Sequence, residues 1–352
     1  MRRIVWIPLA ALVWLSCATD GPSVRSRAEV VEAHVREVRL VSAAPDGFEH
    51  VGNLYVPKWR VGERLPAVVI AHGSGPHDRD GALSGQLGMA FGFSIPTYRE
   101  LAEALQAAGY VVLTYDKRTC GEWNGCGDND YPFGPWVAEV TVRMFSQDFE
   151  GALRFLADQP EVDPERLFAI GHSKGALYVP DAMRRIEGIR AGVMLAGPYS
   201  DVTDVLAHQL EFLERKMRVA GLGETTIEQQ LGPIRLTIEA LRELEAGSWG
   251  NDPIQGLPVA YWKSWLDMGR EARENLPALN RPVLVISGAE DTNVPPSETE
   301  AWARALEGSI HEVKILPCVT HALNCMRGSN FDRHVSPTLI EAVISFLHSV
   351  EK

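Results

Sequence analysis

The sequence predicts an α/β fold in which a mostly parallel central sheet is flanked by helices and carries an inserted helical cap. Short apolar runs alternate with helical patterns along most of the chain, and the runs are continuous, which is typical of strands buried on both faces. The run that ends at Ile170 breaks into Gly-His-Ser-Lys-Gly, which indicates a tight turn between a strand and a helix. Residues 198–280 contain helical patterns and no strand-like run.

The expected strands begin with an antiparallel pair, Val35–Val41 and His50–Pro57, on either side of the turn Pro45-Asp46-Gly47. The runs that predict the parallel strands are Pro66–His72, Tyr110–Asp116, Arg166–Gly171, Ala191–Gly197, Pro282–Gly288 and His311–Pro317. The predicted helices of the core are Thr97–Ala108, Val142–Gln159 and Ser336–Val350. The first two lie between successive strands, as crossover connections in a parallel sheet require.

The segment 198–280 separates two of these strands and is too long to be a structureless loop in a compact domain. Helical patterns cover Leu206–Val219 and Thr226–Glu245. Three tryptophans follow around a Pro/Gly-rich stretch, and they either pack in a core or line an apolar cleft; they are Trp249, Trp262 and Trp265. We therefore expect a helical cap over a core made of residues 27–197 and 281–352.

Residues 1–18 resemble a signal peptide, with two arginines ahead of the apolar run 4–15, which is short for a membrane span. Cleavage after Ala18 fits a small-x-small signal peptidase site. Cleavage before Cys17 fits a bacterial lipobox, except that Trp14 stands at the usual leucine position. An uncleaved anchor is the third possibility. Either cleaved form is exported, so we expect a periplasmic protein, an outer-membrane-anchored lipoprotein or a secreted protein.

The 352-residue chain is 45% apolar and 23% charged, which fits one large domain with an insertion or two smaller domains. Its net charge of −12 and the lack of a basic cluster argue against nucleic acid or an anionic membrane as a partner. A membrane contact is expected only through a lipid on Cys17. The expected partner is a small molecule.

Apart from Cys17, the chain has an even number of cysteines, which in an exported protein indicates two disulfides. They are Cys120, Cys126, Cys318 and Cys325. Three pairings are possible, and four free thiols are the alternative. Their spacing is wider than that of structural zinc sites, so no metal is expected.

Ser173 is the candidate nucleophile, because Gly-x-Ser-x-Gly between a strand and a helix projects the serine hydroxyl from the edge of a sheet. The flanking glycines, Gly171 and Gly175, are needed because the turn leaves no room for a Cβ. A serine of this kind needs a base and an acid that orients the base.

Acid and base candidates follow in chain order, each just beyond a predicted strand. Asp291 follows the strand 282–288, with the adjacent Glu290 as a substitute. His321 follows the strand 311–317, and His334, further along the chain, is the alternative base.

An oxyanion hole needs two backbone N–H groups, for which we predict the amides of Lys174 and Ser74. Lys174 follows the nucleophile at a helix start, where the dipole favours negative charge. Ser74 lies between Gly73 and Gly75, which would let the backbone approach the substrate oxygen; a simple glycine turn is the alternative. The Lys174 side chain is expected to be exposed, where it could steer anionic groups.

From about residue 35 to 350 the chain resembles the α/β-hydrolase superfamily. Some of its motifs resemble a bacterial branch of capped, esterase-like enzymes related to acyl-CoA thioesterase, bile-acid acyltransferase and dienelactone hydrolase proteins. The motifs are His72–Asp80, Tyr115–Arg118, Gly171–Gly175 and Leu195–Pro198. The chain departs from this branch at Lys174 and at Thr119-Cys120, where a second glycine-rich turn is usual. The resemblance implies serine-dependent hydrolysis of carboxylic esters without a metal or other cofactor.

The fold implied by this resemblance favours the local disulfides, Cys120–Cys126 and Cys318–Cys325. In that fold, the strands before the two pairs lie too far apart for a disulfide to join them. Our hypothesis is that the second bridge fixes the loop that carries His321. For Asp78, Arg79 and Asp80 there are two interpretations, a salt-bridged loop or an Arg79 side chain that shapes the substrate pocket.

We therefore expect an exported serine hydrolase of esters with small to medium acyl groups, acting through an acyl-enzyme on Ser173. Thioesterase and peptidase activities on the same triad are the alternatives. Export argues against an acyl-CoA substrate, which is cytoplasmic, and we identify no group that would hold a peptide terminus. A non-catalytic binding protein on the same scaffold is the alternative from another class.

Overall fold

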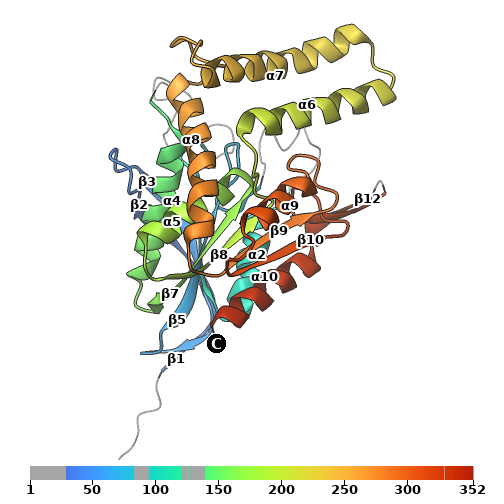
Figure 1. Ribbon diagram of the computed structural model, residues 1–352. Helices are drawn as coiled ribbons and strands as arrows, with labels where there is room; N and C mark the ends of the chain where they lie inside the picture. Colours follow the sequence, from blue (N-terminus) through green and yellow to red (C-terminus); the bar gives the residue numbers. More distant parts are fainter. Residues whose placement is uncertain (1–28, 83–94, 121–125, 127–138, 329, 352) are drawn as a thin grey trace, which may run out of the picture.

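An eight-stranded sheet forms the centre of the computed structural model, in the order β10-β9-β8-β7-β5-β6-β3-β2 (Figure 1). Its strands are β2 (His34–Val41), β3 (Glu49–Val56), β5 (Leu65–Ala71), β6 (Val111–Tyr115), β7 (Val162–His172), β8 (Ile189–Leu195), β9 (Val283–Gly288) and β10 (His311–Leu316). The pairings from β10 to β6 in this order are parallel, and only β3 runs in the opposite direction, antiparallel to both β6 and the edge strand β2. The predicted fold class is confirmed.

The structure describes residues 29–82, 95–120, 126, 139–328 and 330–351. The predicted signal peptide and Cys17 lie outside these ranges. In the part that is described, no helix combines the length and the apolar character needed to cross a membrane.

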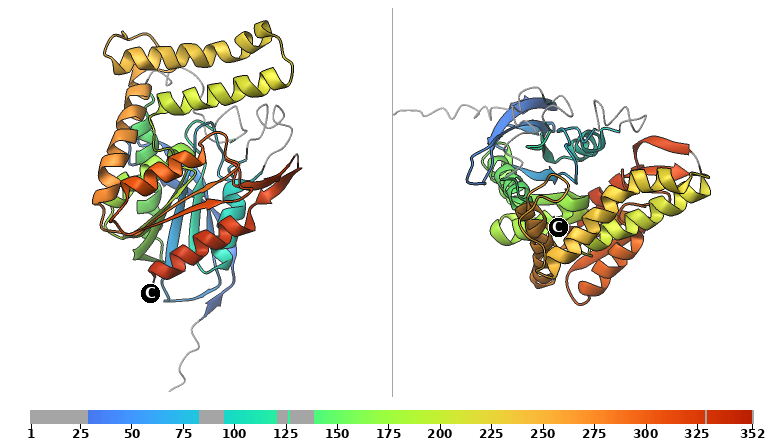
Figure 2. Two further views of the ribbon diagram at one scale, coloured as in Figure 1. Left: turned by 45° about the vertical axis from the view of Figure 1, so that its right-hand side comes forward. Right: turned by 90° about the horizontal axis from the view of Figure 1, so that it is seen from above.

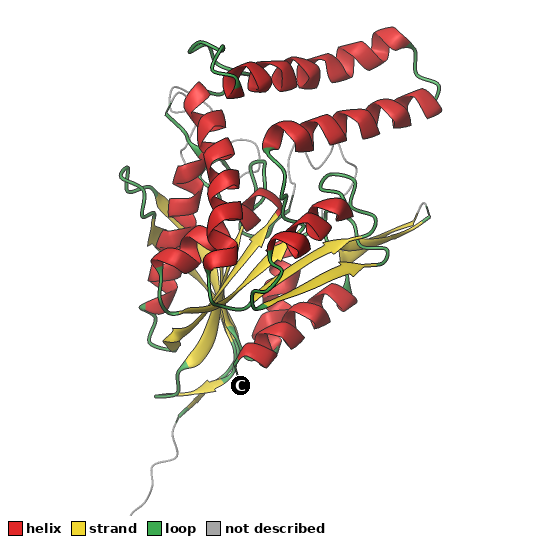
Figure 3. Cartoon of the chain, viewed as in Figure 1, coloured by secondary structure: helices red, strands yellow, loops and turns green. Residues whose placement is uncertain are grey.

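Helices cover both faces of the sheet (Figure 3). The first face packs against α4 (Val142–Ala157), α5 (Tyr178–Arg185), α8 (Val259–Asn275) and α9 (Pro296–Ala305). The second face packs against α2 (Thr97–Ala107) and α10 (Pro337–Val350). Successive residues of β5 enter alternate cores, with Val69 on the first face and Val68 on the second. Burial on both faces explains why these strands are continuous apolar runs in the sequence.

Several short elements were not predicted. A hairpin of β11 (Asn324–Arg327) and β12 (Asn330–Val335) lies between the last sheet strand and α10. Strands β1 (Val30–Val31) and β4 (Trp59–Arg60) form a small separate sheet. Most of β12 is exposed and polar, so no periodic apolar signal marks it in the sequence.

The segment between β8 and β9 is helical, with α6 (Val202–Val219) and α7 (Glu224–Glu245) ahead of α8. Helices α6 and α7 pack side by side and lie beyond the carboxyl ends of the strands, whereas α8 runs back alongside the core (Figure 2). This puts α6 over the edge of the sheet where the predicted site residues lie.

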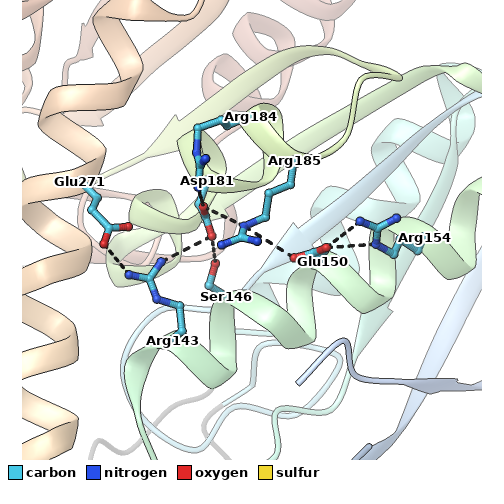
Figure 4. Close-up of polar contacts among 8 residues, drawn as sticks. All are labelled: Arg143, Ser146, Glu150, Arg154, Asp181, Arg184, Arg185 and Glu271. Atoms are coloured by element: carbon cyan, nitrogen blue, oxygen red, sulfur yellow. Dashed lines mark hydrogen bonds and ion pairs between the residues drawn. The ribbon is translucent and has the colours of Figure 1, made fainter. Parts of the chain in front are cut away.

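A polar cluster around the buried Asp181 attaches α8 to the core (Figure 4). Asp181 of α5 is 3% exposed and accepts hydrogen bonds from Ser146 Oγ at 3.2 Å and Arg185 Nε at 3.0 Å. Arg143 of α4 lies between Asp181, at 3.7 Å, and Glu271 of α8, at 2.6 Å. Because these contacts join three helices, α8 is a firm support for the side chains that it presents to the site.

Candidate active site

Ser173 directly follows β7 and is the first residue of a short 3₁₀ helix, Ser173–Leu177. Its backbone has a φ of 54°. A left-handed backbone at a residue other than glycine is strained, and such strain concentrates at functional sites. The flanking glycines are required by space, because a Cβ on Gly171 would lie 2.2 Å from Gly175 O and a Cβ on Gly175 would lie 2.4 Å from His72 O. The turn therefore has the geometry expected from the sequence pattern.

His321 contacts both of its predicted partners. Its Nε2 lies 3.0 Å from Ser173 Oγ, and its Nδ1 lies 2.8 Å from Asp291 Oδ2. The Asp291 side chain is 0% exposed, and its other oxygen accepts hydrogen bonds from the amides of Asn293 and Val294, both at 2.9 Å. The carboxylate is thus fixed by the backbone on one side and orients the imidazole on the other. This is the geometry of a serine nucleophile with a base and an orienting acid.

The two alternative residues lie elsewhere. Glu290 is exposed beside Asp291 and lines the cavity described below, but no contact with His321 is seen in the residues that the structure covers. His334 lies on β12, where its side chain is 83% exposed and pairs with Glu100 at 2.8 Å. The structure brings neither of them to Ser173.

Both local disulfides are present, Cys120–Cys126 and Cys318–Cys325, with Cα–Cα distances of 5.7 and 4.8 Å. The second closes the loop that carries His321. Within that loop the Thr320 amide donates to Asn324 O at 2.8 Å, and the Met326 amide donates to Cys318 O at 2.6 Å. The loop of the base is therefore held by backbone hydrogen bonds as well as by the disulfide.

The loop that contains Ser74 is held at four backbone atoms. Lys117 Nζ donates to Gly73 O at 2.5 Å and to Gly75 O at 2.8 Å. His77 Nε2 lies 2.6 Å from Ser74 O, and the Gly73 amide donates to Tyr98 Oη at 3.1 Å. No acceptor for the Ser74 amide is found among the residues of the described ranges. Because Ser74 and Ser173 line the same cavity, this amide is available to a substrate oxygen.

Burial lowers the pKa of Lys117 to about 7. The amine has enough N–H groups for both carbonyls whether it is protonated or neutral. Lys117 therefore holds the loop across the ordinary pH range.

His172, which the sequence analysis did not single out, joins this loop to the base. Burial, with the nearby His321, lowers the pKa of His172 to about 3, so its ring is neutral. Its Nδ1 lies 3.0 Å from Tyr98 Oη and its Nε2 lies 2.9 Å from His321 O. The Gly73 amide donates to Tyr98 Oη; Tyr98 in turn donates to Nδ1, and Nε2–H donates to the His321 carbonyl. The loop that contains Ser74 (the oxyanion loop) and the loop that carries His321 (the base loop) are thus connected through two buried side chains.

The motif Tyr115–Arg118 supports the same loop. Asp116 pairs with Arg79 at 2.9 Å, and Arg118, which is 0% exposed, pairs with Asp148 of α4. Arg79 also pairs with Glu37 at 2.9 Å and does not line the cavity. Of the two interpretations of this region, the salt-bridged loop is therefore correct. Its residues shape the site indirectly, by holding the backbone before Lys117.

The expectation that the Lys174 side chain is exposed is wrong, because the residue is only 2% exposed. Its Nζ donates to Tyr261 Oη at 3.0 Å and lies over the rings of Phe145, Tyr261 and Trp265, at 4.9, 5.2 and 4.6 Å from their centroids. Tyr261 and Trp265 come from α8, so the sequence near the turn at Ser173 gives no sign of this environment. The lysine backbone still follows the nucleophile at the helix start, as predicted.

A cavity of about 600 Å³ opens above the nucleophile and is mostly apolar. Helix α6 forms its roof with side chains at helical spacing, which are Val202, Val205, Leu206, Gln209, Phe212 and Lys216. Gln209 Nε2 donates to Asn293 O at 2.9 Å and so joins the roof to the loop of Asp291. Of the three predicted tryptophans, Trp265 lines the cavity, whereas Trp262 is buried in the core. An apolar cavity with a few polar groups is typical of a small-molecule site.

One group of described residues has the spacing of metal ligands, namely Asp116, Cys120 and Cys126, whose ligand atoms lie within 4.8 Å of one another. The two sulfurs are bonded to each other, so they offer no thiolates to a metal. The Asp116 carboxylate is paired with Arg79. The donor set of this group does not fit a metal ion.

Comparison with known proteins relates the chain to one family and to several individual proteins. The model of the family described as "Serine aminopeptidase, S33" matches residues 91–325, about two thirds of the chain. Esterase EstD of Thermotoga maritima is 28% identical over 272 residues, which are 75% of this chain and 55% of the esterase. The chain thus spans about half the length of that relative, and less of the other curated relatives that it matches.

Two solved structures share the fold along nearly their whole length. Hypothetical protein PA2218 of Pseudomonas aeruginosa is 20% identical, with a TM-score of 0.53 over 90% of this chain and 94% of that one. Esterase Pf2001 of Pyrococcus furiosus is 17% identical, with a TM-score of 0.52 over 91% and 92%. At these identities the likeness shows a common fold.

Proposed function

The chain belongs to the S33 family of α/β hydrolases, and on that premise we propose that it is an exported serine hydrolase of carboxylic esters. The observation that carries the proposal is the position of His321, within hydrogen-bonding distance of both Ser173 Oγ and the buried Asp291. A non-catalytic protein with this fold would have no need to keep these three side chains within hydrogen-bonding distance.

The reaction follows from the geometry. His321 Nε2 takes the proton of Ser173 as the hydroxyl attacks the ester carbonyl, and Asp291 holds the imidazole and stabilises its charged form. The Ser74 and Lys174 amides bind the oxyanion. The protonated His321 then gives its proton to the leaving alcohol, and an acyl-enzyme remains on Ser173. Water, activated by His321, attacks this acyl-enzyme and releases the acid.

Further observations support the ester substrate and the exported location. A mostly apolar cavity suits small to medium acyl groups, and the relatives include proteins described as esterases. The family description names an aminopeptidase, so amide hydrolysis is the second candidate on the same triad, beside thioester hydrolysis. Two disulfides are typical of an oxidising, exported setting.

The test is ester hydrolysis combined with labelling of the nucleophile. The protein is expected to hydrolyse 4-nitrophenyl esters of short to medium acyl chains and to react with a fluorophosphonate, with the label on Ser173 when mapped by peptide mass spectrometry. Amino acid 4-nitroanilides measure the peptidase alternative in the same assay. A label on another residue, or hydrolysis of the anilides alone, would contradict the ester proposal.

Replacing Lys117 with methionine is expected to lower kcat for a 4-nitrophenyl ester by about tenfold to a hundredfold, with little change in KM. The reason is that Gly73 O and Gly75 O lose their donor, so the loop no longer holds the Ser74 amide in place for the transition state. Steady-state kinetics well below the melting temperature measure the effect. The exposed Lys58→Met is the matched control. A lower melting temperature with unchanged kcat would show that Lys117 is only structural.

Removing the disulfide Cys318–Cys325 with a double alanine variant is expected to lower kcat by about tenfold, because the bridge closes the loop that positions His321. Stability falls by about 2 kcal/mol, measured by urea unfolding. Cys120→Ala/Cys126→Ala removes the other bridge and is expected to change kcat much less. Equal loss of kcat in both double variants would refute a specific role for the base-loop bridge.

A further inference from the structure

The side chain of Lys174 is a buried amine on the residue after the nucleophile, and the proposed mechanism does not use this amine. Three aromatic rings surround its Nζ, from Phe145 on α4 and from Tyr261 and Trp265 on α8. Lys174 and Trp265 both line the cavity above Ser173. Lys174 is therefore part of the wall of the substrate cavity, and its side chain is screened from bulk water.

Among the residues that the structure describes, this amine has no negative partner. In the residues that the structure covers, its only hydrogen-bond partner is the neutral hydroxyl of Tyr261, although a protonated amine has three donors. A buried charge is costly unless an opposite charge pairs with it. Two of the three donors thus have no acceptor among the described side chains.

Without an anion, the surroundings of this amine disfavour its charged form. Burial, together with Lys117, lowers the pKa of Lys174 well below its ordinary value. Of the described residues around it, Lys117 and Tyr261 titrate, whereas Phe145 and Trp265 do not. An entering anion would raise that pKa again, so the anion and a proton would bind together.

The charges of the cavity point the same way, although the whole chain carries a net charge of −12. Lys174 lies in the wall and Lys216 on the α6 roof, and Glu290 is the only acid among the described lining residues. Once an anion has raised the pKa of Lys174, two cations and one acid line the cavity, which favours anionic substrates over neutral ones.

We propose that Lys174 and its three rings form a subsite for an anionic group of the substrate, so that the enzyme prefers esters bearing a carboxylate near the scissile bond. This rests on the proposed ester hydrolase function. The carboxylate accepts charge-assisted hydrogen bonds from Nζ in the low-dielectric cavity, where such bonds are strong. The apolar remainder of the cavity holds the hydrocarbon part.

The test compares pairs of esters of similar size, in which one member carries a carboxylate and the other is neutral. For the acyl side the pair is 4-nitrophenyl hydrogen glutarate and 4-nitrophenyl valerate; for the alcohol side it is 4-acetoxybenzoate and its methyl ester. In at least one pair the wild type is expected to favour the charged member in kcat/KM by about tenfold or more. Lys174→Met is expected to abolish that preference, and Lys263→Met, on the exposed face of α8, to keep it.

An equal charged-to-neutral ratio in wild type and Lys174→Met, in both pairs, overturns the subsite while the ester hydrolase proposal stands. Failure to hydrolyse any of the four esters overturns both. Should Lys174→Met not fold, inhibition of the wild type decides. Glutarate is expected to protect Ser173 from the fluorophosphonate and valeramide is not, and equal protection by the two overturns the subsite.

Discussion

Replacing Ser173 with alanine is expected to lower kcat for 4-nitrophenyl ester hydrolysis by roughly 10⁴- to 10⁶-fold. The hydroxyl is the atom that attacks the carbonyl, and no described side chain stands in the same position to replace it. The residual rate is what the oxyanion hole and substrate binding supply without a nucleophile. Because alanine keeps the backbone and leaves only a small gap, the fold and the affinity for substrate are expected to change little.

The control for this variant is Ser349→Ala, which removes a hydroxyl from the closing helix α10, far from the site in sequence and structure. It is expected to match the wild type in kcat and in fluorophosphonate labelling, whereas Ser173→Ala takes up no label. Wild-type kinetics in Ser173→Ala would end the serine hydrolase proposal. A melting temperature close to that of the wild type excludes unfolding as the cause of the loss.

Replacing Asp291 with asparagine is expected to lower kcat by about 10³- to 10⁴-fold. The structure fixes which way the new amide points. Oδ1 accepts from the amides of Asn293 and Val294, so the amide oxygen takes that place and the NH₂ group faces His321 Nδ1. Nδ1 must then accept a hydrogen bond, which moves the imidazole proton to Nε2. In that tautomer His321 cannot take a proton from Ser173.

Glu290→Gln is the matched control, because it makes the same change of carboxylate to amide one residue earlier. It is expected to keep kcat within about threefold of the wild type, since Glu290 is exposed and does not contact His321. Both variants are measured by steady-state kinetics with the same ester. If Glu290→Gln lost more activity than Asp291→Asn, the assignment of the acid would be wrong.

The sheet could be predicted because parallel strands buried on both faces leave an unmistakable local pattern. The runs that became β5, β6 and β9 are apolar at nearly every position, and each predicted boundary is close to the observed one. The order Ser173, Asp291, His321 could likewise be read along the chain, because each residue lies in the turn or loop that follows a predicted strand of the parallel sheet. The structure then brought the three side chains within hydrogen-bonding distance.

The supporting residues could not be predicted, because their roles depend on contacts between distant parts of the chain. Lys117 looks like an ordinary charge after a strand, yet its partners lie in the loop after β5. In the sequence, Lys174 looks exposed beside the turn at Ser173, but α8, some ninety residues later, covers it with Tyr261 and Trp265. Nor does the exposed, polar β12 carry a pattern by which a strand is recognised.

The roof of the cavity comes from a single continuous helix, and this has a consequence for how such a protein can diversify. The side chains of α6 that face the substrate recur at helical spacing within residues 202–216, whereas the nucleophile, acid and base are placed by strands of the core. Selection can therefore exchange the residues on one face of α6 and redirect the enzyme to new substrates, while the reaction chemistry is inherited unchanged. The link from Gln209 to Asn293 marks a position on that face where a change in substrate preference would also disturb the acid's loop.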